Sequence, residues 1–506
     1  MAQPNTTYAN WSQPDLIARV SALEAQLRTA TLSATLGKKQ PYLKPPKKSP
    51  QPFDPSRYHT RPIALKFAYL GAGYNGFEHH TNNTTPLPTV EEVLWRALLK
   101  TKLIFPAWSE SVTETGWEKA EVEWEGTGYS KCGRTDKGVS AFGQVIGLTV
   151  RSRQPKEGTA TLENTFTSSD EEEAPIKPAF DDVHDELPYI ALLNRVLPSS
   201  IRVLAWCPHP PADFSARFSC KERRYRYFFT NPAYLGDGGA LDIAAMRSAA
   251  GKLEGLHDFR NFCKVDPSKQ ITNFERRIFH ADIHKVNGDN DSPSQSNGAL
   301  LAAPELFYFE VRGSAFLWHQ VRHLIAIIFL VGQGHEKPEI VDQLLDTQTC
   351  TSKPFFEMAD DAPLVLWDCI FPLPGEADAA HLPNGTAKHE GYEDSLKWVY
   401  VGDVNGETGK DGKWGRNGVM QDLWALWRKS KMDEVLADQL MGVVATQGKQ
   451  REDTGENAEG SASTRVFDGS ERARTVGTYV PLMQRKRMEG PEVVNARYRV
   501  RKGMDD

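Results

Sequence analysis

The chain has 506 residues, of which 40% are hydrophobic and 25% charged, and its formal net charge is −6. This length suffices for two sizeable cores, and the composition is typical of a globular protein with polar extensions. No apolar run reaches the roughly 18 residues of a membrane helix, and the N-terminus lacks a secretory layout, so we expect an intracellular protein without a membrane segment.

The N-terminal part, residues 1–60, is predicted to be a polar extension with one helix. Four apolar residues recur there at helical spacing, namely Leu16, Val20, Leu23 and Leu27. Residues 44–52 are rich in Pro and Lys and are predicted to form an extended linker.

The first core is predicted to begin with a strand at 63–70. Thr89 and Glu92 have the spacing of a capping box, which predicts the start of an amphipathic helix. An apolar strand is expected at 144–150. The segment 153–187 is rich in Ser, Glu and Pro and is predicted to be a disordered acidic insertion.

The second core is expected to contain further strands and helices. A polar loop at 286–298 reads as the tip of a long hairpin. The expected elements are a helix near 188–196, strands at 201–206, 223–230, 306–312 and 364–367, and a helix at about 318–331, with 223–230 and 306–312 as partners. This mixed order without βαβ repetition favours an α+β fold on an antiparallel sheet.

Beyond residue 376 the chain becomes rich in Gly and charge, with aromatic islands at 398–400 and 424–427. Residues 446–475 are predicted to be disordered, and the tail at 479–506 is basic. We therefore divide the chain into five parts: 1–60, the N-terminal half 61–205, the C-terminal half 206–375, a low-complexity and partly disordered insertion 376–478, and the tail 479–506.

The charge of the chain is unevenly distributed. Residues 170–186 hold eight carboxylates against one lysine, whereas residues 201–230 hold six Lys or Arg against two acids. Nucleic-acid binding needs a local positive surface and not a positive total. Aromatic residues alternate with the basic ones at 217–227 and 485–502, which suits RNA, although in the tail a solvated charged face explains the pattern equally well.

Three sequence patterns bear on whether the chain binds a cofactor or a metal. Residues 71–76 fit Gly-x-Gly-x-x-Gly after a strand, but the next helix begins only near Thr89, which disfavours a dinucleotide site. His319 and His323 are one helical turn apart and His335 is near, yet no Glu stands beside the first His. The six cysteines contain no Cys-x-x-Cys pair. We predict no metal, no nucleotide and no other cofactor.

The most informative loop is Gly133-Arg-Thr-Asp-Lys-Gly-Val-Ser-Ala141, in which Asp136 stands between Arg134 and Lys137. The glycines allow tight turns, and the two cations favour an ionised carboxylate, which suits a nucleophile or an anchor. The same pattern is also ordinary turn chemistry.

This loop resembles the catalytic loop of the TruA family of tRNA pseudouridine synthases. Two further segments match in the same order: residues 223–227 resemble the family's Arg/Lys-x-Tyr-x-Tyr strand, and residues 313–323 resemble its late helix. The resemblance covers roughly residues 61–375 with gaps. It is strongest to the eukaryotic branch that modifies uridines 38 and 39 of the anticodon stem-loop.

The resemblance implies a pseudouridine synthase fold, with two α/β halves joined by a largely antiparallel mixed sheet and a catalytic cleft between them. It assigns Asp136 as the essential carboxylate, Tyr225 as the ring that stacks on uracil, and Arg322 as the ion-pair partner of Asp136. It implies contacts with the substrate for Arg134, Lys137, Arg224, Arg226 and Leu364.

The predicted function is isomerisation of uridine to pseudouridine in tRNA, through a base flipped out of the stem-loop. A synthase of the same family with other target positions is the nearest alternative, and a non-catalytic RNA-binding protein or chaperone is the alternative from another class. The resemblance also points to a homodimer. Two short basic stretches, ending at Lys48 and Arg487, are weak nuclear import candidates, which leaves nucleus and cytoplasm open.

Overall fold

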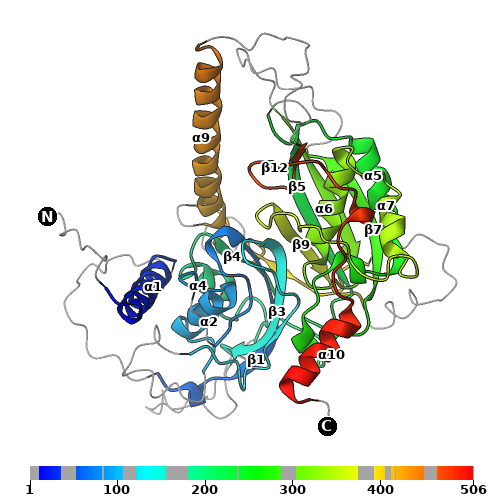
Figure 1. The fold of residues 1–506 in the computed structure, drawn as a ribbon. Helices are drawn as coiled ribbons and strands as arrows, with labels where there is room; N and C mark the ends of the chain where they lie inside the picture. The colour runs from blue at the N-terminus through cyan, green and yellow to red at the C-terminus, as the bar shows by residue number, and fades with distance from the viewer. Residues whose placement is uncertain are drawn as a thin grey trace, which may run out of the picture. The chain divides into compact units, whose positions relative to one another are not determined.

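The computed structural model describes residues 11–35, 53–81, 85–105, 121–154, 180–235, 239–286, 304–373, 392–404, 412–415, 418–448 and 464–504. The chain divides into two compact units (Figure 1). Unit 1 contains residues 1–138, 145–217 and 397–424, and unit 2 contains residues 139–144, 218–396 and 425–506. The predicted linker at 44–52 and most of the predicted insertion 153–187 and hairpin tip 286–298 lie outside the described residues.

Unit 1 is built on strands in the order β10-β4-β1-β3. Strand β1 (Thr60–Tyr69) pairs antiparallel with β4 (Ile201–Cys207), and β10 (Val399–Tyr400) extends the edge beyond β4. The short β2 (Ser130–Lys131) pairs with β3 (Ser140–Arg151). The strands predicted at 63–70, 144–150 and 201–206 are confirmed.

The helices of unit 1 begin where the sequence signals them. Thr89 Oγ1 accepts a hydrogen bond of 3.2 Å from the amide of Glu92 at the start of α2 (Val90–Lys100). The Glu92 carboxylate accepts from Arg96, at 2.9 Å, and from Arg28 of α1 (Gln13–Thr35), at 2.8 Å. Arg28 therefore ties α1 to α2, whereas the Arg96 contact lies within α2. The third helix is α4 (Tyr189–Asn194).

Unit 2 is built on strands in the order β9-β5-β8-β7-β6, with the first residues of β3 beside β9. The strands are β5 (Glu222–Asn231), β6 (Gly255–Asp258), β7 (Glu275–Lys285), β8 (Glu305–Gly313) and β9 (Leu364–Ile370). Strands β5 and β8 pair antiparallel, as predicted, with Tyr225 opposite Val311. Among the described strands, β3 and β9 pair in parallel, whereas β1–β4, β5–β9 and β7–β8 pair antiparallel. This confirms an α+β fold on a large mixed sheet.

The core of unit 2 forms between this sheet and α6 (Gln320–Gly332), which is buried along its whole length. Its Phe329 packs edge-on against Tyr227 and Phe229 of β5, with ring centroids 5.7 and 5.4 Å apart. Helix α5 (Ile243–Gly251) contacts both α6 and β7, and α7 (Ile340–Leu345) follows α6 (Figure 1). The helix predicted at 318–331 is confirmed.

The C-terminal region is more ordered than the sequence suggests. Residues 446–475 were predicted to be disordered, but within the described part of the chain Thr464–Val466 (β11) and Arg474–Val476 (β12) form an antiparallel hairpin. Burial of Phe467 against Phe329 explains the order, because one aromatic ring anchors an otherwise polar segment. The basic tail contains α10 (Pro491–Lys502), preceded by a short turn at Leu482–Gln484.

A long helix, α9 (Val419–Ala445), was not predicted and lies inside the segment 376–478 (Figure 1). Its first turn is held in unit 1 by an ion pair of 2.6 Å between Asp422 and Arg202. Most of its side chains are exposed, including apolar ones such as Leu436 and Leu440, which are one helical turn apart. A search of the described residues finds no helix with the length and apolarity needed to cross a membrane.

Candidate active site

The Asp136 loop connects β2 to β3 in unit 1 and is anchored through its neighbour Thr135. The Thr135 hydroxyl forms a buried hydrogen bond of 2.7 Å with the phenol of Tyr69, at the end of β1. The Thr135 carbonyl accepts a bond of 3.1 Å from the amide of Phe77. Gly138 has φ +83°, a left-handed conformation that glycine adopts without strain. The loop therefore holds Asp136 in a partly exposed position next to a fixed residue.

Gly76, the last glycine of the segment 71–76, has a structural reason to be glycine. It has φ +78°, and a Cβ atom built there would lie 3.0 Å from the carbonyl oxygen of Thr135. Its own carbonyl accepts from the amide of Val90, and the carbonyl of Phe77 accepts from Glu91, both at the start of α2. The third glycine thus supports the Asp136 loop and does not open a helix, which differs from the geometry of a dinucleotide fingerprint.

One cation of this loop, Arg134, and Lys131 on the preceding strand β2 lie close to carboxylates. The guanidinium of Arg134 lies 3.0 Å from Glu78, and Lys131 lies 3.0 Å from Glu78 and 2.8 Å from Glu91. The side chain of Arg134 is still 51% exposed, and Lys137 is exposed. Sequence reasoning missed Tyr69, Glu78 and Gly76 as parts of this site, because no local pattern links them to the loop. The predicted substrate contacts of Arg134 and Lys137 stay predictions.

Strand β5 places Tyr225 and Tyr227 on one face of the sheet in unit 2, as expected from their alternation with arginines. Tyr225 is 9% exposed and packs edge-on against Phe316, with centroids 5.1 Å apart. Tyr227 is completely buried, and burial raises the pKa of its phenol. Tyr227 is therefore a core residue, while the side chain of Tyr225 still reaches the surface of the unit.

The two arginines that flank Tyr225 are held within unit 2. Arg224 forms an ion pair of 2.6 Å with Glu222. Arg226 bonds to Glu310 at 2.8 Å, and its guanidinium lies 3.9 Å from the centroid of the Trp367 ring. Such stacking with an aromatic ring fixes the direction of the guanidinium. An RNA phosphate would have to compete with these carboxylates, so direct binding by either arginine stays a prediction.

Arg322 lies near the start of α6 and is buried, at 8% exposure. Its Nε donates to the carbonyl of Ala359 at 2.7 Å, and Nη1 lies 3.5 Å from the carboxylate of Asp361. Leu364, at the start of β9, is also buried and lies opposite Tyr227 in the sheet. The predicted ion pair between Arg322 and Asp136 joins residues of different units and stays a prediction.

The histidines weighed as metal ligands have partners within the chain. Nδ1 of His323 lies 2.9 Å from the carbonyl of His319, and burial lowers the pKa of His323 to about 3. Nε2 of His335 lies 3.1 Å from the carbonyl of Arg465, and its ring stacks on Tyr479. These contacts are those of packing residues.

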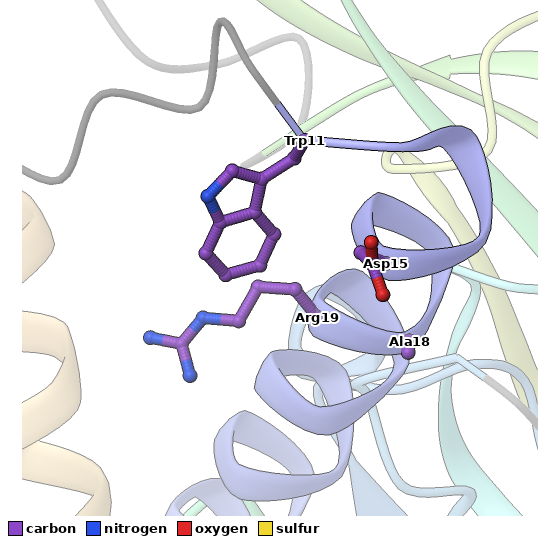
Figure 2. Close-up of a pocket in the computed structure, with 4 residues that line it drawn as sticks. All are labelled: Trp11, Asp15, Ala18 and Arg19. Atoms are coloured by element: carbon purple, nitrogen blue, oxygen red, sulfur yellow. The ribbon is translucent and has the colours of Figure 1, made fainter.

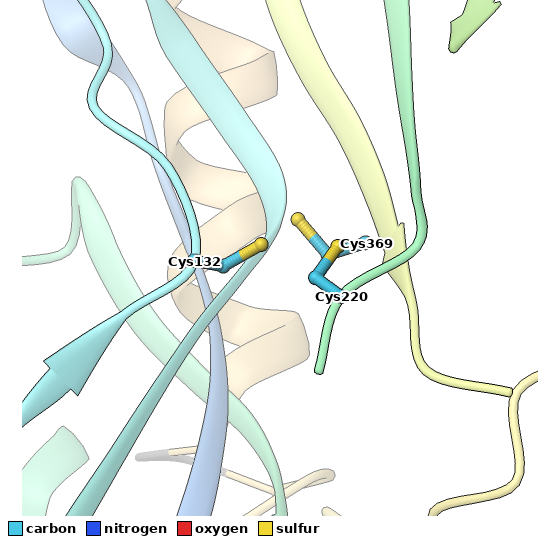
Figure 3. A group of neighbouring side chains, drawn as sticks. All are labelled: Cys132, Cys220 and Cys369. Atoms are coloured by element: carbon cyan, nitrogen blue, oxygen red, sulfur yellow. The ribbon is translucent and has the colours of Figure 1, made fainter. Parts of the chain in front are cut away.

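A surface hollow and a pair of buried cysteines lie apart from the predicted catalytic residues. The start of α1 borders a surface hollow of about 390 Å³ lined by Trp11, Asp15, Ala18 and Arg19 (Figure 2), all of which are exposed. All six cysteines are buried, and in unit 2 the sulfurs of Cys220 and Cys369 lie within 4.8 Å of each other (Figure 3). Neither feature contains a residue predicted to take part in catalysis.

Comparisons with known proteins agree with the motifs. A family model described as tRNA pseudouridine synthase matches residues 249–372. The tRNA pseudouridine(38/39) synthase of Saccharomyces cerevisiae is 35% identical over 515 residues, which covers 99% of this chain and 94% of the yeast protein. The mouse protein of the same name is 46% identical over 326 residues, covering 64% of this chain and 58% of the mouse protein.

A more distant relative matches over part of the chain. A tRNA pseudouridine synthase A of the archaeon Methanothrix thermoacetophila is 32% identical over 290 residues, covering 57% of this chain and 76% of the archaeal protein. The yeast match extends over nearly all of both chains. The loop, strand and late-helix motifs, the α+β fold and these alignments together place the chain in the TruA family of tRNA pseudouridine synthases.

Proposed function

We propose that this chain converts uridine to pseudouridine at positions 38 and 39 of the tRNA anticodon stem-loop. The observation that carries this proposal is the match to the yeast tRNA pseudouridine(38/39) synthase over 99% of the chain. The Asp136 loop, which the hydrogen bonds of Thr135 hold in place, supplies the carboxylate that such a reaction needs.

The reaction breaks the N-glycosidic bond of uridine, turns the freed base and re-forms the link through carbon. The base must first leave the stack, at a cost of a few kcal/mol. We assign the essential carboxylate to Asp136 and the stacking contact with uracil to Tyr225, with Leu364 as an apolar wall. Holding the freed base next to the sugar favours its recapture over its loss. We assign to Arg322 the ion pair with Asp136, which would fix the direction of the carboxylate.

The decisive test compares wild type with Asp136→Ala and Asp136→Asn on a tRNA transcript that carries uridines at positions 38 and 39. Pseudouridine is read by chemical mapping, and tRNA binding is measured in parallel. We expect pseudouridine formation to fall to background in both variants while the binding constant changes little. Asp213→Ala, which alters an exposed aspartate of the same unit, is the control and should keep full activity.

Each outcome of this test has a clear meaning. Equal modification by wild type and Asp136→Ala would contradict the role of Asp136. Modification at other uridines would identify a synthase of the same family with different targets. Binding without modification by the wild-type protein would favour the RNA-binding alternative.

We further propose that the protein is a homodimer, as the family resemblance implies. One chain has a mass of 56.6 kDa. Light scattering coupled to size-exclusion chromatography should therefore give twice this mass. A mass equal to that of a single chain across micromolar concentrations would contradict this proposal.

For localisation we propose nuclear import through the basic stretch that ends at Lys48, which lies outside the described residues. The alternative stretch at 485–487 is part of the fold, since Arg487 donates to the carbonyl of Ser352 and the carbonyl of Lys486 accepts from Phe355. A fluorescent fusion carrying Lys47→Ala and Lys48→Ala should lose nuclear signal. Unchanged nuclear signal in that variant would contradict the assignment.

A further inference from the structure

Strand β7 carries a cluster of potential metal ligands that is unrelated to the Asp136 loop. His280, Asp282 and His284 alternate along the strand and therefore project from the same face of the sheet. The two imidazole rings converge, with centroids 6.1 Å apart. One donor atom from each of the three side chains lies within 4.8 Å of the others.

The ring of His280 is already oriented by a carboxylate. Its Nδ1 lies 3.1 Å from Oε1 of Glu254, and the same oxygen accepts a hydrogen bond of 3.1 Å from the amide of Ala281. Because Nδ1 faces Glu254, Nε2 is the ring nitrogen left to coordinate an ion. A carboxylate that holds the second nitrogen of a ligand histidine is the usual outer contact of metal sites.

The carboxylate of Asp282 contacts the next two residues of the strand. Oδ1 accepts a bond of 2.7 Å from the amide of Ile283, and Oδ2 lies 4.0 Å from Nε2 of His284. Among the described residues, the Lys or Arg side chain that pairs with Asp282 is Arg247, 3.8 Å away, which also donates to the carbonyl of Ile283 at 2.9 Å. Glu310, opposite Asp282 on β8, is paired with Arg226. The ion pair of Asp282 with Arg247 is thus a long one, at 3.8 Å.

We propose that His280, Asp282 and His284 form a binding site for a divalent transition-metal ion such as Zn²⁺. Two imidazoles and one carboxylate are ligands that Zn²⁺ accepts, with a water at the fourth position. Tetrahedral coordination at about 2.0–2.1 Å needs ligand atoms about 3.3 Å apart, so the side chains must close by a small rotation. Their exposures of 35%, 35% and 37% leave room for this movement.

The test uses the full chain, stripped of metal with a chelator and titrated with ZnCl₂ by calorimetry. We expect one ion per wild-type chain and at least about tenfold weaker binding after His280→Ala with His284→Ala, because two of three ligands are lost. Glu254→Gln should weaken binding by about 10–100-fold without removing a ligand. If circular dichroism shows that the double variant does not fold, Asp282→Asn replaces it as the ligand variant, because it preserves the size of the side chain, and it should also weaken Zn²⁺ binding.

The matched control is His184→Ala with His209→Ala, since both histidines are exposed and each lies 3.2 Å from an aspartate in unit 1. These changes should leave Zn²⁺ binding unaltered. Co²⁺ should give the visible spectrum of nitrogen and oxygen ligands, whereas strong ultraviolet thiolate bands would mean binding through cysteine and would overturn the proposal. Binding by the β7 variants equal to wild type, or no binding by wild type, would overturn it as well.

Discussion

At the scale of single residues, Gly76 controls the position of the Asp136 loop. Its φ of +78° is strained for any other residue, and a Cβ atom there would lie only 3.0 Å from the carbonyl oxygen of Thr135. We predict that Gly76→Ala lowers the free energy of unfolding by about 1–3 kcal/mol, the usual cost of local backbone strain. Pseudouridine formation should also fall, because Asp136 follows Thr135 in the displaced loop. Urea denaturation and chemical mapping measure the two effects.

Gly73→Ala is the matched control for Gly76→Ala. A Cβ atom at Gly73 meets no atom within 4 Å, and its φ is not in the left-handed region. This variant should therefore keep the stability and activity of wild type. Equal losses in both variants would show that glycine at position 76 is not required for steric reasons.

A second residue-scale prediction concerns the buried carboxylate of Glu222 and the dependence of stability on pH. Burial by itself raises the pKa of Glu222, but hydrogen bonds from Arg312, Arg224 and the amide of Tyr392 lower it by more, so the net pKa is below the usual value. A lowered folded-state pKa stabilises the protein above the unfolded pKa of about 4.3, and this stabilisation is lost as the pH falls through the folded-state pKa.

We therefore expect Glu222→Gln to cost about 2 kcal/mol of unfolding free energy between pH 6 and 8, because hydrogen bonds to a charged group are lost. The difference from wild type should shrink as the pH falls below about 4.3. Denaturant titrations across this pH range measure it. A cost that is constant down to the lowest accessible pH would show that the charge of Glu222 does not contribute.

At the scale of elements, the hairpin of β11 and β12 packs against the core of unit 2 through a glycine. Gly469, between these strands, has φ +90°, and a Cβ atom built there would overlap the hydroxyl of Tyr227. We predict that Gly469→Ala lowers the unfolding free energy by about 1–3 kcal/mol through overpacking. Gly477→Ala is the control, since a Cβ atom there meets nothing within 4 Å. Equal stability of both variants, measured by thermal unfolding, would contradict the packing argument.

Helix α10 packs on unit 2 through one side and carries exposed basic residues near its end. The buried Asn495 donates to the carbonyl of Ile271 at 3.0 Å and accepts from Gln270 at 3.3 Å through its own carbonyl. This anchoring leaves Arg501 and Lys502 exposed at the end of the helix. The basic tail is therefore a fixed cationic surface of unit 2, and we expect it to contact the tRNA backbone.

At the scale of the whole molecule, the net charge of −6 conceals such local cationic surfaces. Arg501→Ala with Lys502→Ala should weaken tRNA binding and reduce the slope of log K against log salt by about 2, because each phosphate contact contributes about 1. The control is Arg428→Ala with Lys429→Ala, which removes two exposed cations from α9. The tRNA binding constants of wild type and both double variants, measured between 50 and 200 mM salt, test this prediction. Equal slopes in the two double variants would contradict a specific role for α10.

The sequence by itself determined the family, the α+β class and most strands and helices of the two units. Those features depend on local patterns, such as the alternation in β5, the cap at Thr89 and the order of three motifs. The tertiary structure alone decided that Tyr69 anchors Thr135, 66 positions along the chain, and that Glu78 engages Arg134. It also decided that Phe467 orders a polar hairpin. Contacts between distant segments follow from how the whole chain is routed, and no periodicity or spacing in the sequence encodes that routing.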